Sequence, residues 1–219
     1  MKPGDRSQSI TRTIVLVSTS ARRREILSLL GLPFQIVAPR FEEILSDERS
    51  IREEVSLFAE EKARSVLAEF PQSILIGSDT LIECEGEKIG KPRDPSDARR
   101  ILRQLGGRRH RIWTAVFLID SPASLSETVI EKVDVLFKKM EEAEIESYVA
   151  TGEPLDKAGA YSLQGEGRRW IARLEGDYLA AVGLPLKPIA GFLQRGGIAV
   201  PRDINRLYRE KAFMNWKTF

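Results

Sequence analysis

Residues 13–20, with the sequence Thr-Ile-Val-Leu-Val-Ser-Thr-Ser, are the stretch that decides the fold. The apolar, β-branched run at its start predicts a buried strand. The hydroxyl of Ser20 then offers an N-cap for a helix over about 20–30, which Gly31 ends. A strand that leads directly into a helix predicts the first unit of an α/β fold.

The alternation continues along the rest of the chain. We expect further strands over 34–38, 73–77, 111–120, 128–138 and 170–174, a hairpin that turns at Glu85 and Gly86, and helices over 50–70, 95–105, 141–151 and 186–194. Strands that alternate with helices predict an α/β sheet covered by helices on both faces. The residues from 196 onward are basic and aromatic without clear periodicity, so no element is predicted there.

Length and charge restrict the classes of protein. At 219 residues the chain can form one sizeable α/β domain, or two small lobes that share a core. The net charge of +2 is nearly balanced, whereas nucleic-acid binding usually requires a basic face. The polar residues 1–12 lack the apolar core of a signal peptide, and no run approaches the roughly 20 apolar residues of a membrane span. We therefore expect a cytoplasmic protein that binds neither membranes nor nucleic acid.

The scarcity of cysteine and histidine restricts the chemistry. With Cys84 as the one cysteine, an internal disulfide and a multi-cysteine zinc site are both excluded, which is typical of a reducing compartment. With His110 as the one histidine, a multi-histidine metal centre is excluded as well. A bound metal would have to be held mainly by oxygen atoms, which favours magnesium or manganese over zinc.

An acidic residue follows the apolar strand over 73–77. By period-two counting, Asp79 shares a strand face with Leu75 and Leu81. Burying a carboxylate there is costly unless a cation, a proton or a metal compensates it, so we favour a functional role over an exposed aspartate at a strand end. In the helix over 50–70, Lys62 falls within the apolar stripe. It either extends out to solvent or reaches into a cleft to meet an anion, and we favour the cleft.

Other basic residues lie where an anion could bind. Arg22 and Arg23 fall in the first turn of a helix, where a phosphate could lie between the helix N-terminus and the guanidinium groups. The alternative is a solvated basic turn. Lys91 precedes a proline, which favours an extended backbone and a rigidly presented ammonium group.

A second loop-rich segment adds a lysine and an amide. Lys157 precedes two small residues that allow a ligand close to the backbone, and Gln164 could bind a base edge or a phosphate. An ordinary polar loop is the alternative. Taken alone, Glu43 looks like a surface residue in a turn, and His110 looks structural.

Short blocks of this sequence match those of a known family in the same order. These blocks are Ser18-Thr19-Ser20-Ala21-Arg22-Arg23, Glu43, Glu61-Lys62-Ala63, Gly77-Ser78-Asp79-Thr80, Gly90-Lys91-Pro92, His110 with Thr114, Thr151-Gly152-Glu153-Pro154, Asp156-Lys157-Ala158-Gly159-Ala160-Tyr161, Gln164-Gly165 and Gly183-Leu184-Pro185-Leu186. The chain resembles the Maf proteins, which are nucleoside triphosphate pyrophosphatases, over about residues 13–195.

The resemblance implies a fold and a reaction. The fold is a mixed α/β sheet flanked by helices, in two lobes around a deep cleft, distantly similar to inosine triphosphate pyrophosphatase. The domain would cover residues 1–195, with 196–219 as a C-terminal extension. The reaction is hydrolysis of a nucleoside triphosphate to the monophosphate and pyrophosphate with a divalent metal, Mg²⁺ or Mn²⁺. Thr80, Lys157 and Gln164 match the subgroup that acts on dTTP and UTP better than the 7-methyl-GTP subgroup.

The resemblance also implies roles for the residues. Asp79 would be the general base or hold a metal-bound water, with Glu43 as second metal carboxylate and Lys91 as a catalytic cation. The residues expected to bind substrate are Ser20, Arg22, Arg23, Lys62, Thr80, Lys157 and Gln164. Among these, Thr80 and Gln164 are the candidates for base discrimination. The replacement of a usual proline by Ala21 affects details of recognition more than the reaction. The alternative function is a nucleotide-binding regulator of cell division without turnover, and a homodimer stays open.

Overall fold

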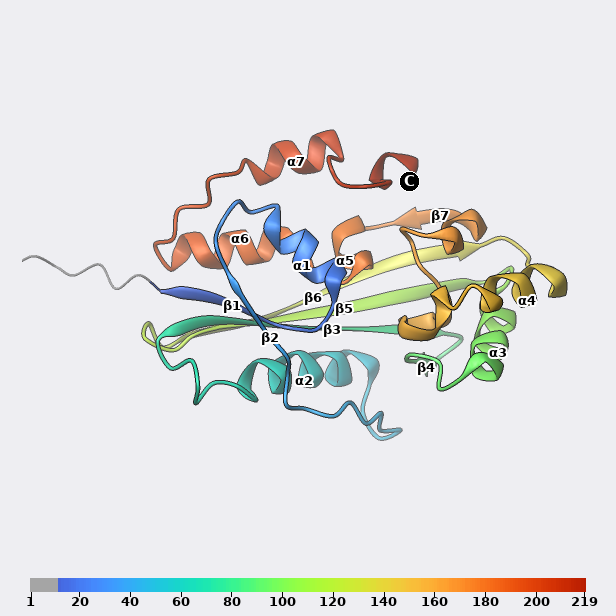
Figure 1. The fold of residues 1–219 in the computed structure, drawn as a ribbon, viewed down its shortest axis with the longest axis horizontal. Helices are drawn as coiled ribbons and strands as arrows, with labels where there is room; N and C mark the ends of the chain where they lie inside the picture. The colour runs from blue at the N-terminus through green and yellow to red at the C-terminus, as the bar shows by residue number, and fades with distance from the viewer. Residues whose placement is uncertain (1–11) are drawn as a thin grey trace, which may run out of the picture.

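The computed structural model describes residues 12–219 and has one mixed sheet at its centre (Figure 1). Its strands are β1 (Thr13–Val17), β2 (Gln35–Val37), β3 (Ser73–Cys84), β4 (Glu87–Ile89), β5 (Arg109–Asp120), β6 (Leu125–Phe137) and β7 (Ile171–Glu175). They lie in the order β2-β1-β3-β5-β6-β7, and β4 pairs with β3. β1 runs parallel to β2 and β3, and the other pairs are antiparallel. The expectation of a mixed α/β fold is confirmed. Of the polar N-terminal segment predicted over 1–12, residues 1–11 lie outside the described residues.

Helices cover both faces of the sheet. They are α1 (Ala21–Ser28), α2 (Ile51–Arg64), α3 (Pro95–Leu105), α4 (Glu142–Ala150), α5 (Tyr178–Val182), α6 (Leu186–Arg195) and α7 (Ile204–Glu210). α2 covers one face, while α1, α5, α6 and α7 lie on the other (Figure 1). α3 and α4 pack together near one end of the long strands. No helix in the described part of the chain is long and apolar enough for a membrane span.

The N-termini of α1 and α2 are specified locally. Ser20 caps α1, because its hydroxyl accepts a hydrogen bond from the Arg23 backbone nitrogen at 3.4 Å. Ser50 and Glu53 form a capping box at the start of α2, each side chain accepting from the other's backbone nitrogen. These short-range bonds specify both helix starts, of which the sequence analysis predicted the cap at Ser20.

Some predicted bounds were wrong. The helix expected over 50–70 ends at Arg64, and the hydroxyl of Ser65 donates to the Lys62 carbonyl at 2.7 Å just past its end. The strand expected over 73–77 continues to Cys84, because β3 pairs with β5 along almost its whole length. Helices α5 and α7 were not predicted. Both are short and depend on tertiary packing more than on their own periodicity.

Gly77 allows α2 to lie directly on β3. A Cβ atom at this position would be 2.2 Å from the Ala59 carbonyl oxygen and 2.9 Å from the Ala63 backbone nitrogen. Only glycine permits this approach of helix backbone to strand. The close contact brings the buried face of α2, including Lys62, against the face of β3 that carries Asp79.

Candidate active site

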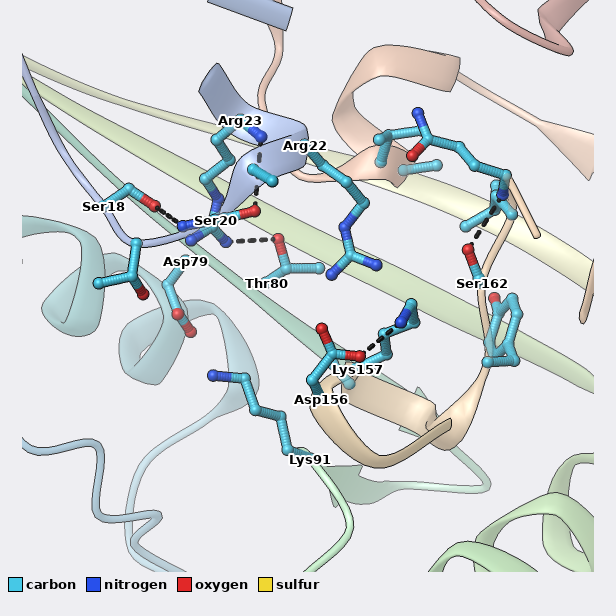
Figure 2. A pocket seen from close by; sticks show the side chains of 18 of the residues that line it. Ser18, Ser20, Arg22, Arg23, Asp79, Thr80, Lys91, Asp156, Lys157 and Ser162 are labelled. Carbon is cyan, nitrogen blue, oxygen red and sulfur yellow. Dashed lines mark hydrogen bonds and ion pairs between the residues drawn. The ribbon is translucent and has the colours of Figure 1, made fainter. Parts of the chain in front are cut away.

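A cleft of about 760 Å³ opens between α1, α2 and the segment that follows α4. It collects side chains from widely separated parts of the chain (Figure 2). Every residue that the sequence predicted for the site lines this cleft: Ser20, Arg22, Arg23, Glu43, Lys62, Asp79, Thr80, Lys91, Lys157 and Gln164. The structure therefore brings the predicted residues together, while their roles stay predictions.

The cleft contains a carboxylate that is buried. Asp79 is 3% exposed, and its Oδ1 accepts from the ammonium of Lys62, which is 4% exposed. Its other oxygen, Oδ2, is buried and has no hydrogen-bond partner among the described residues. Burial raises the pKa of Asp79 above its ordinary value, against the opposing attraction of Lys62. Such a carboxylate has a free lone pair and an increased proton affinity.

Lys62 also holds a second carboxylate. Its Nζ lies 2.6 Å from Glu43 Oε1, and the Glu43 side chain is 34% exposed. Burial disfavours ionisation of Glu43, but the charge and hydrogen bond of Lys62, together with Lys91 and Arg23, outweigh it and lower the pKa of Glu43. Lys62 reaches into the cleft, as the sequence predicted, and its contacts there are with carboxylates.

Arg23 is fixed by a chain of hydrogen bonds. Its Nε donates to the Gly183 carbonyl at 2.9 Å, and its Nη2 donates to Thr80 Oγ1 at 3.2 Å. The hydroxyls of Thr80 and Thr114 are 3.0 Å apart, and Thr114 donates to the Ala180 carbonyl at 2.8 Å. Thr80 must therefore donate to Thr114, because the single proton of Thr114 is used. Burial lowers the pKa of the Arg23 guanidinium.

This network bears on the predicted role of Thr80. Its hydroxyl proton points to Thr114 and one of its lone pairs is occupied by Arg23. A contribution to base discrimination would have to use the remaining lone pair, the methyl group or the position of Arg23. The role in base discrimination stays a prediction. Thr114, to which the sequence reasoning assigned no chemical role, completes the network.

Two cations point into the cleft without a protein partner. Arg22 and Lys91 both extend toward its centre (Figure 2), and among residues 12–219 neither has an ion pair or side-chain hydrogen bond. Lys157 differs, because it donates to the Glu153 carbonyl at 2.7 Å and pairs with Asp156. Unpaired cations beside a buried carboxylate are typical of a site that receives an anion.

Gln164 is presented by a tightly bonded turn. Ser162 Oγ accepts from the backbone nitrogens of Gln164 and Gly165, at 3.2 and 3.1 Å. The carboxylate of Glu153 accepts from the Gly167 backbone at 3.2 Å and from the Tyr148 hydroxyl at 2.6 Å. The Gln164 Nε2 atom is buried and has no partner in the described part of the chain. A fixed turn thus carries a free amide donor.

His110 lies outside the cleft. It is 1% exposed, and its Nε2 lies 2.8 Å from the Tyr161 hydroxyl. Its ring also packs edge-on against Phe137. Burial lowers the pKa of His110 to about 3. The structure agrees with the structural role that the sequence predicted.

The donor set for a metal is small and consists of oxygen atoms. Within residues 12–219 no group of three or more His, Cys, Asp and Glu side chains could hold a metal ion. Asp79 and Glu43 converge on one ammonium group, and Asp79 Oδ2 is free. Mg²⁺ usually binds proteins through one or two carboxylates and takes its other ligands from water and substrate phosphates. The two carboxylates fit such an ion.

Known proteins resemble this chain along most of its length. Residues 13–196 match the family described as Maf-like protein. A dTTP/UTP pyrophosphatase of Bacillus velezensis is 42% identical over 177 residues, which cover 81% of this chain and 93% of the relative. A dTTP/UTP pyrophosphatase of Moorella thermoacetica is 42% identical over 187 residues, which cover 85% of this chain and 96% of the relative. The solved Ham1 protein of Staphylococcus aureus is 15% identical, with a TM-score of 0.46, and covers 84% of this chain and 100% of its own.

Proposed function

This chain belongs to the Maf-like family, and on that premise we propose that it hydrolyses dTTP and UTP to the nucleoside monophosphate and pyrophosphate. The observation that carries the proposal is the position of Asp79. It is a buried carboxylate with one oxygen that has no partner within residues 12–219, in a cleft into which Arg22 and Lys91 extend, both unpaired in that part of the chain. This arrangement suits a polyanion that must be attacked by water.

The reaction requires charge compensation. Water attacks the α-phosphorus, the bond from this phosphorus to the bridging oxygen breaks, and pyrophosphate leaves with the electron pair of that bond. Negative charge therefore grows on the leaving group, and catalysis consists mainly of positioning and charge neutralisation. Arg22, Arg23, Lys91 and Lys157 are proposed to bind the phosphates, and the backbone at the N-terminus of α1 around Ser20 offers further donors.

Asp79 is proposed to activate the water. Its raised pKa increases its affinity for the proton that the water loses, and its free Oδ2 provides the acceptor atom. Asp79 and Glu43 would also hold Mg²⁺ or Mn²⁺, which would lower the pKa of a bound water and neutralise phosphate charge. Lys62 is proposed to hold these two carboxylates together beside the phosphate-binding cations.

Base recognition is proposed to depend mainly on Gln164. Its amide can both donate to and accept from a pyrimidine edge. Its buried Nε2 has no partner among the described residues, so an acceptor on the base would satisfy this donor.

With Cys84 as the one cysteine, we propose a reducing compartment, the cytoplasm, for the enzyme.

A panel of nucleoside triphosphates tests the proposal. Purified protein is incubated with dTTP, UTP, CTP, GTP and 7-methyl-GTP in Mg²⁺ or Mn²⁺, and pyrophosphate and orthophosphate are measured separately. We expect pyrophosphate, fastest with dTTP and UTP. Release of orthophosphate would contradict cleavage at the α-phosphorus, and faster turnover of 7-methyl-GTP would contradict the subgroup.

The rival function is nucleotide binding in the regulation of cell division without turnover. The same panel separates the two, because a regulator would bind nucleotide without releasing pyrophosphate. Asp79→Asn serves as the control for contaminating hydrolases, since their activity would persist in this variant.

A further inference from the structure

The C-terminal segment, residues 197–219, lies beyond the residues that match the family and packs on the main domain. Figure 1 shows it on the side of the sheet that carries α5 and α6. Ile204, Phe213 and Trp216 are buried and belong to the large core cluster. The segment is therefore part of the folded domain.

Aromatic contacts attach the segment to α5. Tyr178 stacks on Trp216 with ring centroids 5.4 Å apart, and on Phe219 at 5.6 Å. The Tyr208 hydroxyl donates to Asp177 Oδ2 at 2.8 Å, and the other oxygen of Asp177 caps α5. α5 ends in residues that line the cleft, so these contacts connect the segment with the cleft wall.

Asn215 connects the same segment to the turn that carries Gln164. Its Nδ2 donates to the Leu163 carbonyl at 2.7 Å, and its Oδ1 accepts from the Tyr178 hydroxyl. Leu163 directly precedes Gln164 and also lines the cleft. The side chain of Asn215 is thus satisfied on both sides, and its neighbour Met214 lines the same cleft as Leu163 and Gln164.

Met214 has an unusual conformation for its position. Its φ angle is +40°, in the left-handed region that non-glycine residues avoid. It is 57% exposed and lines the cleft. Buried Phe213 and hydrogen-bonded Asn215 hold the backbone on either side. Residues held in strained conformations cluster at ligand-binding and active sites, and Met214 is such a residue at a cleft.

The lining of the cleft contains two kinds of residue. Asp79, Glu43, Lys62 and Lys91 supply charge, which suits phosphates and a metal. Met214 lines the same cleft as the apolar residues Leu163, Ala181 and Val182 and the amide of Gln164, and its neighbour Asn215 bonds to the Leu163 carbonyl. A pyrimidine has apolar faces and polar edges, so these residues match a base.

We propose that Met214 forms one wall of the base-binding site and packs on the face of the pyrimidine whose edge meets Gln164. Thioethers contact aromatic rings favourably and adapt to their shape. Asn215 acts as a positioning residue for both Met214 and the Gln164 turn. The inference rests on the proposed function, because that function supplies the pyrimidine.

Equilibrium binding of the reaction products tests Met214 without requiring turnover. Binding of UMP and of pyrophosphate to the full chain is measured by calorimetry for wild type, Met214→Ala, Met214→Leu and Ile36→Ala. Ile36 is the matched control, since it is 46% exposed on β2 and does not line the cleft. Melting temperatures show whether each variant is folded.

The expected pattern is specific to the base. Loss of the thioether removes apolar contact with the base, so the UMP Kd rises about tenfold in Met214→Ala. Met214→Leu and Ile36→Ala stay within about twofold of wild type, and the pyrophosphate Kd is unchanged in all variants. Three results would overturn the proposal. They are an unchanged UMP Kd in Met214→Ala, a weakening of pyrophosphate binding that parallels that of UMP, and the absence of UMP binding by wild type. If the expected binding pattern is found but the triphosphate panel shows no release of pyrophosphate, only the proposed hydrolysis is rejected.

Discussion

Lys62 of α2 and Asp79 of β3 form a buried ion pair across the helix–sheet interface, and Glu43 contacts the same ammonium from a loop. Gly77 makes this pair geometrically possible, because its missing side chain lets the α2 backbone approach the strand. Burial of the pair leaves Asp79 with a raised pKa and an unpartnered oxygen. The features that make Asp79 suitable as a base also make it unfavourable for folding.

Asp79→Asn is expected to abolish most of the hydrolysis. The amide keeps the shape of the side chain but cannot take a proton or bind a metal as a carboxylate does. We expect kcat to fall by about 10²–10⁴-fold, the usual contribution of a general base. The measurement is pyrophosphate release from dTTP. Asp47→Asn, at an exposed position outside the cleft, is the matched control and should behave as wild type. Near-normal turnover by Asp79→Asn would exclude the role.

The same substitution is expected to change how the stability of the metal-free protein depends on pH. A group whose pKa is raised by folding contributes stability below its unfolded pKa of about 3.9, and this contribution is lost as the pH rises through the folded pKa. The Asn side chain does not titrate, so the variant does not lose this contribution to stability as the pH rises. The difference in the free energy of unfolding, variant minus wild type, should therefore increase from pH 4 to pH 8. Denaturant unfolding in EDTA measures this difference at both pH values. A difference that shrinks as the pH rises would contradict the raised pKa.

Thr80→Val is expected to impair all substrates alike. The change keeps the shape but removes the acceptor of Arg23 and the donor to Thr114. Losing about 1.4 kcal/mol of positioning corresponds to a roughly tenfold fall in kcat/KM. Thr80→Ser keeps the hydroxyl and is the control, with activity close to wild type. Steady-state kinetics with dTTP, UTP and GTP supply the comparison. A change in the ratio among bases would instead assign direct base discrimination to Thr80.

Gly77→Ala is expected to separate α2 from the sheet. The new methyl group would overlap the Ala59 carbonyl oxygen, which belongs to backbone and cannot rotate away. We expect a loss of about 3 kcal/mol in the free energy of unfolding, together with lower activity as Lys62 moves. Gly191→Ala is the control, because it lies in α6 with only the end of Arg195 nearby and should be neutral or slightly stabilising. Equal stability of the two variants would refute the close packing.

His110 should make stability depend on pH between 7 and 5. Its pKa is about 3 in the folded protein and about 6.5 unfolded, so stability is full above pH 6.5 and is lost as the pH falls below that value. The expected slope approaches 1.4 kcal/mol per pH unit, roughly one proton. His110→Gln lowers stability through lost packing but should lack this slope, and urea unfolding at several pH values compares the two proteins. Parallel curves would show that His110 does not remain neutral in the fold.

Much of the fold follows from local sequence. The strand and helix starts around Ser20 and Ser50 depend on side chains within a few residues of the backbone they bind. The apolar stripe of α2 carried Lys62 on its buried face, and period-two counting placed Asp79 on one strand face with Leu75 and Leu81. Such regularities extend over one helical turn or one strand, so they can be recognised in the sequence without knowing which distant segment packs against them.

Other features depend on distant parts of the chain. β3 extends to Cys84 because β5 supplies its hydrogen bonds, and α7 forms where Tyr208 packs edge-on against Trp216, which in turn stacks on Tyr178. Neither partner is near in sequence, and short elements have little stability of their own.

The amino-acid sequence determined which chemical groups would line the cleft: a buried aspartate, lysines, arginines and one amide, in an alternating α/β chain. Only the tertiary structure decided how they meet. It joined Lys62 to both Asp79 and Glu43, committed Thr80 to Arg23 and Thr114, and carried Met214 from the C-terminal segment to the cleft. The physical reason is that side-chain partners, burial and charge compensation arise from packing between segments far apart in the chain, whereas periodicity and caps act within a few residues.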